Sequence, residues 1–196
     1  MPTLHILAGP NGTGKTTFYE TAVSEGFIDK QLPFVNVDLI ARSFGSYSAE
    51  NFQRADEEAR LQIGNHLSDM SDFMIESNLA MQSDYDWTYA IMKKGYEVAI
   101  YFLYTTDVSV NINRVKKRVA EGGHDIAVPI IEHRYKTGLS YLKSNLHKFQ
   151  HVYLIDTSED TATIMAEIHA GKIIFEEQNS PDWVSQALFI TKRLNR

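Results

Sequence analysis

Short apolar runs alternate with segments of helical periodicity along this chain of 196 residues. Six runs predict β-strands, at residues 3–8, 34–37, 72–75, 97–104, 152–155 and 172–175. The fourth run reads EVAIYFLY and is apolar almost throughout, which is typical of a central strand buried on both faces. Apolar positions three and four residues apart predict helices at 16–24, 49–70, 107–120 and 129–147.

This alternation predicts an α/β fold, with a mostly parallel sheet that has helices on both faces. No internal repeat, low-complexity tract or linker interrupts the pattern, so we expect one domain over residues 1–196. The helices expected at 107–120 and 129–147 are joined by a glycine-containing loop with basic residues on both sides. We therefore expect a helical lid at about residues 114–134.

The segment after the first expected strand has the spacing of a phosphate-binding loop, G-x-x-x-x-G-K-[ST]. Its glycines allow the backbone N–H groups to face a phosphate chain, and the following helix offers its free N-terminal amides to the same anion. In such loops the lysine contacts the β- and γ-phosphates of a triphosphate such as ATP, and the Ser/Thr hydroxyl binds Mg²⁺. The residues expected to bind ATP are Gly9, Pro10, Asn11, Gly12, Thr13, Gly14, Lys15, Thr16 and Thr17.

Composition narrows the class of protein. A formal net charge of -6 argues against general binding to nucleic acid or to an anionic membrane. The absence of cysteine excludes disulfides, thiolate metal sites and cysteine nucleophiles. No apolar run approaches the roughly 20 residues that cross a bilayer, and the N-terminus runs directly into an expected strand, without room for a signal peptide. We expect a cytoplasmic protein.

Three acidic residues follow expected strands. In an open parallel sheet, ligands bind beyond the carboxyl ends of the strands, and Asp38, Glu76 and Asp156 each come after such an end. Each is a candidate for the acid that supports Mg²⁺, and each is also a residue type that caps helices or forms turns. A kinase acting on an alcohol further needs a carboxylate that accepts the hydroxyl proton, and Asp38 is the candidate for this base.

Positive charge for phosphoryl transfer is expected from the lid. Arg114 and Arg118 lie four residues apart on one helix, and Arg134 follows on the next helix, beyond a Gly-Gly-His loop. Arginines on both sides of a loop suit a lid that brings charge onto phosphates, and one such arginine can contribute roughly 10³–10⁵ in rate. The alternative is a solvent-exposed basic helix face. His124 in the loop is a further candidate for substrate contact, with a plain loop role as its alternative.

Five segments together resemble the zeta-toxin family of P-loop kinases, and more closely its short single-domain "predicted ABC-type ATPase" relatives. They are AGPNGTGKTTF, FVNVDLIAR, IESNL, GYEVAIYFLY and RVKKRVAEGGHDIAVPIIEHRY, and the resemblance extends to about Tyr141. Many families share the phosphate loop, whereas the ordered set is much more specific. The "ABC-type" label is not literal here, because the chain has no LSGGQ-like signature.

The resemblance implies a three-layer P-loop kinase fold and transfer of the γ-phosphoryl group of ATP to a hydroxyl of a nucleotide sugar. In zeta toxins that acceptor is UDP-N-acetylglucosamine. It also implies, if the protein is a toxin, an antitoxin protein that blocks the ATP site. The chain departs from its relatives in having His133 before Arg134, and Thr157 where they tend to have Asn.

The resemblance also assigns roles to single residues. Lys15 and Thr16 match the ATP and Mg²⁺ residues, and Asp38 matches the catalytic base. Arg118 and Arg134 match the arginines that hold phosphates during transfer. On the acceptor side, the expected substrate-binding residues are Asp38, Arg42, Glu76 and His124.

Two other functions are compatible with the same residues. The chain is alternatively a kinase for another hydroxyl, such as that of a nucleoside or another metabolite. It is also alternatively a nucleotide-dependent switch, in which the acid and the arginines order loops around the γ-phosphate and chemistry is slow.

Overall fold

The computed structural model describes residues 1–45 and 47–195. In this part of the chain the strands form one seven-stranded sheet with the order β2-β3-β1-β4-β5-β6-β7. The strands are β1 (Thr3–Ala8), β2 (Phe34–Val35), β3 (Phe73–Ser77), β4 (Glu97–Tyr104), β5 (His151–Asp156), β6 (Thr163–His169) and β7 (Lys172–Glu176). The helices are α1 (Lys15–Ser24), α2 (Val37–Ser43), α3 (Ala49–Asp69), α4 (Gln82–Met92), α5 (Val108–Ala120), α6 (Val128–Asn145), the 3₁₀ turn η1 (Leu146–Lys148) and α7 (Asp182–Leu194).

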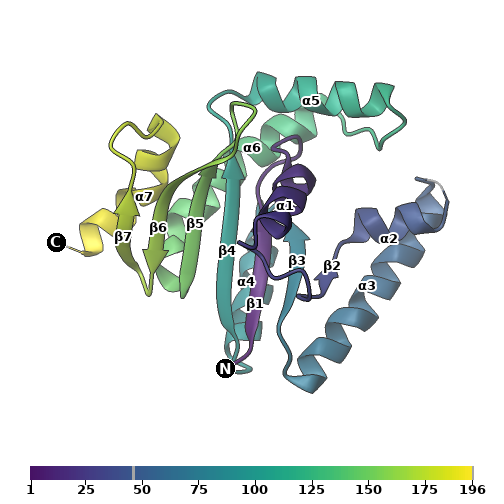
Figure 1. The fold of residues 1–196 in the computed structure, drawn as a ribbon, viewed down its shortest axis with the longest axis horizontal. Helices are drawn as coiled ribbons and strands as arrows, with labels where there is room; N and C mark the ends of the chain where they lie inside the picture. The colour runs from purple at the N-terminus through teal and green to yellow at the C-terminus, as the bar shows by residue number, and fades with distance from the viewer. Residues whose placement is uncertain (46, 196) are drawn as a thin grey trace.

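The sheet is parallel through its first five strands and antiparallel at one edge. β2, β3, β1, β4 and β5 pair in parallel, whereas β6 pairs antiparallel with both β5 and β7. This confirms the expected α/β class and mostly parallel sheet. Helices cover both faces: in Figure 1, α1 lies in front of β1 and β4, α4 and α6 lie behind the sheet, and α5 lies above it.

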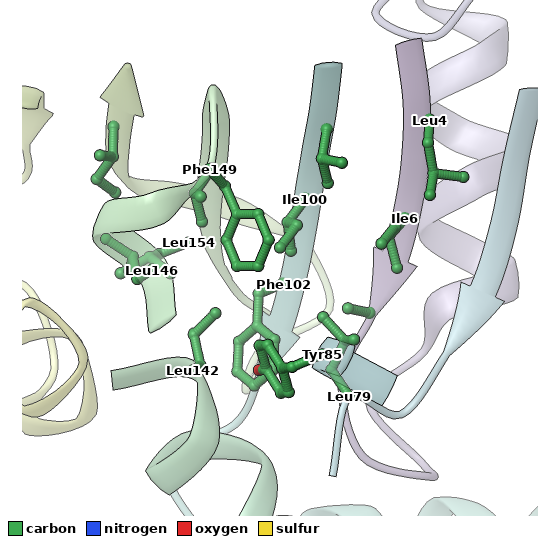
Figure 2. Close-up of a cluster of buried hydrophobic side chains, with 14 of the residues drawn as sticks. Leu4, Ile6, Leu79, Tyr85, Ile100, Phe102, Leu142, Leu146, Phe149 and Leu154 are labelled. Atoms are coloured by element: carbon green, nitrogen blue, oxygen red, sulfur yellow. The ribbon is translucent and has the colours of Figure 1, made fainter. Parts of the chain in front are cut away.

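The hydrophobic core is divided by the sheet into two clusters. Behind the sheet, Ile6 and Phe102 pack with Tyr85 of α4, Leu142 of α6 and Trp183 of α7. Figure 2 shows the central part of this cluster, with Ile6, Ile100 and Phe102 on the strands and Tyr85, Leu142 and Phe149 on the segments that cover them. In front of the sheet, a smaller cluster packs the strands against α1. The buried apolar area on both faces holds the strand ends, and thus the site built on them, in place.

The second expected strand is shorter in the structure than in the prediction. The strand was expected to reach residue 37, but β2 ends at Val35 and α2 begins at Val37. Asn36 is the reason, because its side-chain oxygen accepts a hydrogen bond from the backbone N–H of Leu39 at 3.1 Å and caps the helix. Asp38 therefore lies in the first turn of α2 instead of at the end of a strand.

Three further elements were not predicted: β6, α4 and α7. β6 and β7 form a hairpin whose two-residue turn, Ala170-Gly171, has φ angles of 47° and 73°. Positive φ at both turn positions is the geometry that matches the twist of paired strands. The usual sequence signal for such a turn is Asn-Gly or Asp-Gly, so alanine at the first position hides it. None of the helices in residues 1–45 and 47–195 is long and apolar enough to cross a membrane.

Candidate active site

The phosphate-binding loop joins the carboxyl end of β1 to the start of α1. Gly12 and Gly14 have φ angles of 82° and 80°, which glycine adopts without strain. A Cβ atom on Gly12 would lie 2.3 Å from the backbone oxygen of Asn111, so α5 packs directly on the loop. Gly14 precedes α1 and has no side chain with which to cap the first helical amides. A loop of this shape, with uncapped amides at its end, fits a phosphate group.

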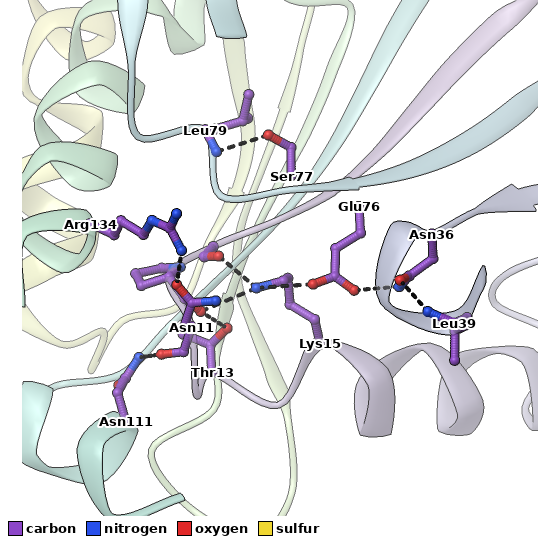
Figure 3. A network of polar contacts seen from close by, with 12 residues as sticks. Asn11, Thr13, Lys15, Asn36, Leu39, Glu76, Ser77, Leu79, Asn111 and Arg134 are labelled. Atoms are coloured by element: carbon purple, nitrogen blue, oxygen red, sulfur yellow. Dashed lines mark hydrogen bonds and ion pairs between the residues drawn. The ribbon is translucent and has the colours of Figure 1, made fainter. Parts of the chain in front are cut away.

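Lys15 lies inside this loop and is almost fully buried, with a relative exposure of 6%. Its ammonium Nζ donates hydrogen bonds to the backbone oxygens of Gly9, at 2.8 Å, and Pro10, at 3.2 Å. It also forms an ion pair with Glu76, with 3.4 Å between Nζ and Oε1. Figure 3 shows the ammonium between the loop and the Glu76 carboxylate. The lysine thus connects the expected phosphate site to the expected acceptor side.

Glu76 reaches this position because β3 pairs in parallel with β1. The strand register places Glu76 beside Leu7, two residues before the loop begins at Gly9. Its second oxygen, Oε2, accepts a hydrogen bond of 2.7 Å from Nδ2 of Asn36. Asn36 in turn caps α2, which carries the exposed Asp38. Three elements that are distant in the sequence therefore meet beside Lys15.

A cavity of about 360 Å³ lies next to this group. Five of the residues expected in the site line it: Asn11 of the phosphate loop, Asp38, Glu76, His124 and Arg134. Its other walls are polar at Asn36, Ser77, Asn78 and Asp125 and apolar at Val37, Ile126, Ala127 and Ile130. The volume falls in the range of small-molecule sites, and the walls provide both polar and apolar contacts.

Arg42 lies in a second cavity of about 480 Å³, which it lines with Tyr47 and Gly122. His124 and Asp125 line both cavities. The ring of His124 also packs against Phe52, at a centroid distance of 4.8 Å. The loop between α5 and α6 therefore rests on the start of α3, and the two cavities adjoin at this loop.

The three arginines expected in the lid have different surroundings. Nη1 of Arg134 donates to Oδ1 of Asn11 at 2.8 Å, which places its guanidinium on the phosphate loop. Nη2 of Arg118 donates to the backbone oxygen of His124 at 2.8 Å and so holds the loop between α5 and α6. Within the described part of the chain, Arg118 is not among the residues that line the cavity of Asp38. Nη1 of Arg114 donates to the backbone oxygen of Thr157 at 2.7 Å, away from the cavity.

A comparison with models of protein families matches residues 1–168 to the family described as zeta toxin. The chain belongs to the zeta toxin family. This confirms the resemblance noted in the sequence. No curated protein matches the chain at a significant level.

Solved structures share this zeta toxin fold at low sequence identity. A crystal structure of AvrRxo1-ORF1 with AvrRxo1-ORF2 and sulphate ions has a TM-score of 0.74 and 18% identity, covering 95% of this chain and 64% of that one. A structure of the same pair with ATP has a TM-score of 0.69, the same 18% identity and the same two coverages, 95% and 64%. The chain thus spans 64% of the length of these AvrRxo1 chains. A structure of the PezAT toxin–antitoxin system of Streptococcus pneumoniae has a TM-score of 0.62 and 15% identity, covering 100% of this chain and 86% of that one.

Asp156 has a structural role, which removes one of the three candidate acids. Its Oδ2 accepts a hydrogen bond of 2.8 Å from the indole Nε1 of Trp183, and its Oδ1 accepts one of 2.9 Å from the backbone of Ser158. Both oxygens are thus occupied in a carboxylate that is only 7% exposed. Asp156 fixes α7 to β5, and Asp38 and Glu76 remain the acids beside the phosphate loop.

Two tyrosines fix α6 against the central strand and so place Arg134. The hydroxyl of Tyr135 donates to the backbone oxygen of Thr105 at 2.7 Å, and that of Tyr104 donates to the backbone oxygen of Tyr135 at 2.9 Å. Burial raises the pKa of both Tyr104 and Tyr135, so the two hydroxyls stay protonated and keep donating. Arg134, one residue before Tyr135, is thereby held over the phosphate loop.

Several residues of the site were not predicted from the sequence. Asn36 has a recognisable helix-capping position, but the expected strand concealed it. Asn111 donates from Nδ2 to the backbone oxygen of Asn11 at 2.8 Å, a contact over 100 positions that no local pattern announces. Asn78 and Ser77 follow Glu76 at the end of β3 and line the same cavity. The one sign of their role in the sequence was their position directly after an expected strand.

Proposed function

We propose that this chain is an ATP-dependent kinase that transfers the γ-phosphoryl group to a hydroxyl of a small molecule. Membership of the zeta toxin family supports a P-loop kinase-like function. The observation that carries the proposal is the cavity in which Asp38, Glu76 and Arg134 meet Asn11 of the phosphate loop. A nucleotide sugar, with UDP-N-acetylglucosamine first, is the proposed acceptor.

On the donor side, the loop and the start of α1 would bind the triphosphate of ATP. Lys15 would exchange its backbone partners, Gly9 and Pro10, for phosphate oxygens. Thr16, exposed at the start of α1, would supply the protein ligand of Mg²⁺. In phosphoryl-transfer sites Mg²⁺ takes most of its other ligands from phosphates and water, and it offsets their charge.

On the acceptor side, Asp38 would accept the proton of the acceptor hydroxyl. The oxygen of that hydroxyl would attack the γ-phosphorus. The new O–P bond forms as the bond to the β–γ bridging oxygen breaks, and ADP leaves. Asp38 suits this role because it is exposed and faces the cavity from the first turn of α2. Arg134 would stabilise the negative charge of the transferring group from its place above Asn11.

Polar groups in the cavity support an acceptor rich in hydroxyl or amide groups. Asn36, Ser77 and Asn78 line the cavity on the side of Glu76, and Asp125 lines it from the loop between α5 and α6. Side chains with hydrogen-bonding groups in a cavity fix the orientation of a polar ligand. The apolar wall at Ile126 and Ile130 offers contact to a less polar part of the same molecule.

We propose that the lid, at about residues 114–134, acts with the rest of residues 1–196 as a single domain. Arg118 would hold its loop through the His124 carbonyl and contact phosphates on closure. We also propose that the protein has an antitoxin-like protein partner and is located in the cytoplasm. The PezAT structure is of a toxin–antitoxin system, which supports the first of these.

The proposal is tested with Asp38→Asn, which removes the base and retains the size of the side chain. Wild type and variant are incubated with ATP and UDP-N-acetylglucosamine, then with a panel of nucleosides and sugars, and products are identified by mass spectrometry. We expect kcat to fall roughly 10²–10⁴-fold in the variant. ATP affinity, measured by titration, should be unchanged.

The matched control is Asp182→Asn, because Asp182 is also an exposed aspartate in the first turn of a helix. It should retain the wild-type rate. Equal rates in wild type and Asp38→Asn would exclude Asp38 as the base. Phosphorylation of a different panel member alone would exclude the nucleotide sugar and retain the kinase.

A further inference from the structure

Both ends of the Asn36 side-chain amide are used, and they join two different elements. Oδ1 accepts from the backbone N–H of Leu39 at 3.1 Å, which fixes the start of α2. Nδ2 donates to Oε2 of Glu76 on β3 at 2.7 Å. With a relative exposure of 4%, Asn36 makes both bonds away from competing water. Figure 3 shows the amide between Leu39 and Glu76.

The contact with Glu76 extends this connection to the phosphate loop. Oε1 of Glu76 lies 3.4 Å from Nζ of Lys15, so among residues 1–45 and 47–195 each carboxylate oxygen has one partner. A phosphate in the loop would compete with Glu76 for the Lys15 ammonium. The amide of Asn36 would then be the remaining protein group on the carboxylate and would hold Glu76 in the cavity wall.

We propose that Asn36 is a positioning residue that holds the Glu76 carboxylate toward the acceptor when Lys15 turns to the donor phosphates. The inference rests on the proposed function. An amide is suited to this task because it accepts on one side and donates on the other. Loss of the Nδ2 donor should therefore raise the KM for the acceptor, while kcat and the KM for ATP change little.

Two substitutions separate this role from helix capping. Asn36→Ser retains a capping oxygen and loses the donor to Glu76, since serine and asparagine are comparable N-caps. We expect an acceptor KM raised about tenfold at every pH, the fold-change of one lost hydrogen bond to a charged group. Asn36→Asp also retains the cap but places a second carboxylate against Glu76.

The Asn36→Asp variant has a pH dependence that capping alone does not produce. At low pH the two adjacent carboxyl groups share one proton, which restores a hydrogen bond between them. As pH rises the pair loses this proton and the two charges repel. The acceptor KM should therefore approach that of wild type at low pH and increase with pH.

The role can also be tested without any acceptor substrate. The free energy of unfolding of Asn36→Asp is measured relative to that of wild type at several pH values. The Lys15 ammonium, 3.4 Å from Oε1 of Glu76, favours the charged form of this carboxylate and so opposes the effect. Two carboxyl groups at hydrogen-bond distance nevertheless bind their shared proton more tightly than the unfolded chain does, so the variant should lose stability as pH rises. A carboxylate that only caps a helix becomes a better cap when it ionises, which is the opposite sign. The matched control is Ser48→Asp, because Ser48 caps α3 in the same way, through its contact with the Asn51 N–H at 3.1 Å.

The outcomes distinguish the two proposals. Loss of stability with rising pH in Asn36→Asp alone, together with the raised acceptor KM, supports the positioning role. The same pH trend in Ser48→Asp, or an acceptor KM unchanged in both Asn36 variants, overturns it. A wild type that phosphorylates no acceptor overturns the kinase proposal, while the pH-dependent stability still reports the contact between Asn36 and Glu76.

Discussion

Arg134 has a role at the residue scale that its neighbours in the lid do not share. Its guanidinium contacts Asn11 of the phosphate loop, whereas Arg118 and Arg114 bond backbone carbonyls of His124 and Thr157. The sequence predicted that arginines on both sides of a loop would converge on phosphates. Which of them contacts the phosphate loop in the structure depends on helix orientation, because positions equivalent in spacing face different neighbours once α5 and α6 are packed.

Arg134→Lys should therefore lower kcat by roughly 10³-fold or more, because a single ammonium cannot replace the planar guanidinium at a transferring phosphoryl group. Steady-state kinetics with ATP and the acceptor would measure this effect. The control is Arg114→Lys, which loses carbonyl contacts far from the cavity and should keep kcat within a few fold. Similar losses in both variants would contradict the distinction.

The positions of the acidic residues could be predicted from the sequence, whereas their bonding partners could not. Asp38 and Glu76 follow apolar runs, and the carboxyl ends of parallel strands gather at one edge of a sheet. The hydrogen bond from Asn36 to Glu76 joins positions 40 residues apart, and Lys15 meets Glu76 across two strands. Contacts of this kind follow from strand order, which periodicity does not reveal.

At the scale of elements, prediction was most reliable for long, amphipathic helices and central strands. β1 and β4 have the bounds expected, and α3 ends within one residue of its expected end. The error at β2 arose because a single capping asparagine ended an apolar run early. The β6–β7 hairpin was not predicted, because its turn has alanine, in place of the usual asparagine or aspartate, at a position of positive φ.

Gly64 in α3 offers a test of element stability that is separate from the site. It lies exposed in the helix interior, and a Cβ atom added there would have no heavy atom within 4 Å. Gly64→Ala should therefore stabilise the protein by about 0.5–1 kcal/mol, because alanine loses less backbone entropy in a helix. Urea unfolding would measure the gain, with activity unchanged.

Gly12→Ala is the counterpart, because its φ of 82° and the Asn111 oxygen 2.3 Å from a Cβ leave no room. This variant should lose stability and ATP affinity together. A loss of stability in Gly64→Ala would show that α3 is distorted at that position.

At the scale of the whole molecule, the two ends of the parallel strands have different chemistry. The phosphate loop, Asp38 and Glu76 lie at the carboxyl ends of the parallel strands. Three histidines lie in one row toward the amino ends of these strands, where the register joins His5 to Ala99, Ala99 to His151 and His151 to His169. Burial lowers the pKa of His5, against a smaller opposing effect of Asp72, and burial also lowers that of His151.

These lowered pKa values predict that the protein loses stability in mild acid. The unfolded chain binds protons at His5, His147 and His151 below about pH 6.5, where the folded protein still excludes them. The free energy of unfolding should therefore show no loss from these histidines above this pH and should decrease as pH falls below it. Urea unfolding at pH 8, 6.5 and 5.5 would measure the trend, and His5→Gln should reduce its slope. A slope unchanged by His5→Gln would exclude a contribution from this residue.

The α/β class, the spacing of the phosphate loop and the family could be predicted from the chain alone, because they depend on local spacing and on the order of segments. Strand periodicity and the glycine–lysine spacing act over a few residues and can be read directly. Strand pairing and helix packing were needed to show that Asn36, Glu76 and Lys15 form one connected group, that Asp156 bonds Trp183 of α7, and that Arg134 contacts Asn11 of the phosphate loop. These roles depend on which strands pair and how helices face them, and those choices minimise the free energy of the whole chain.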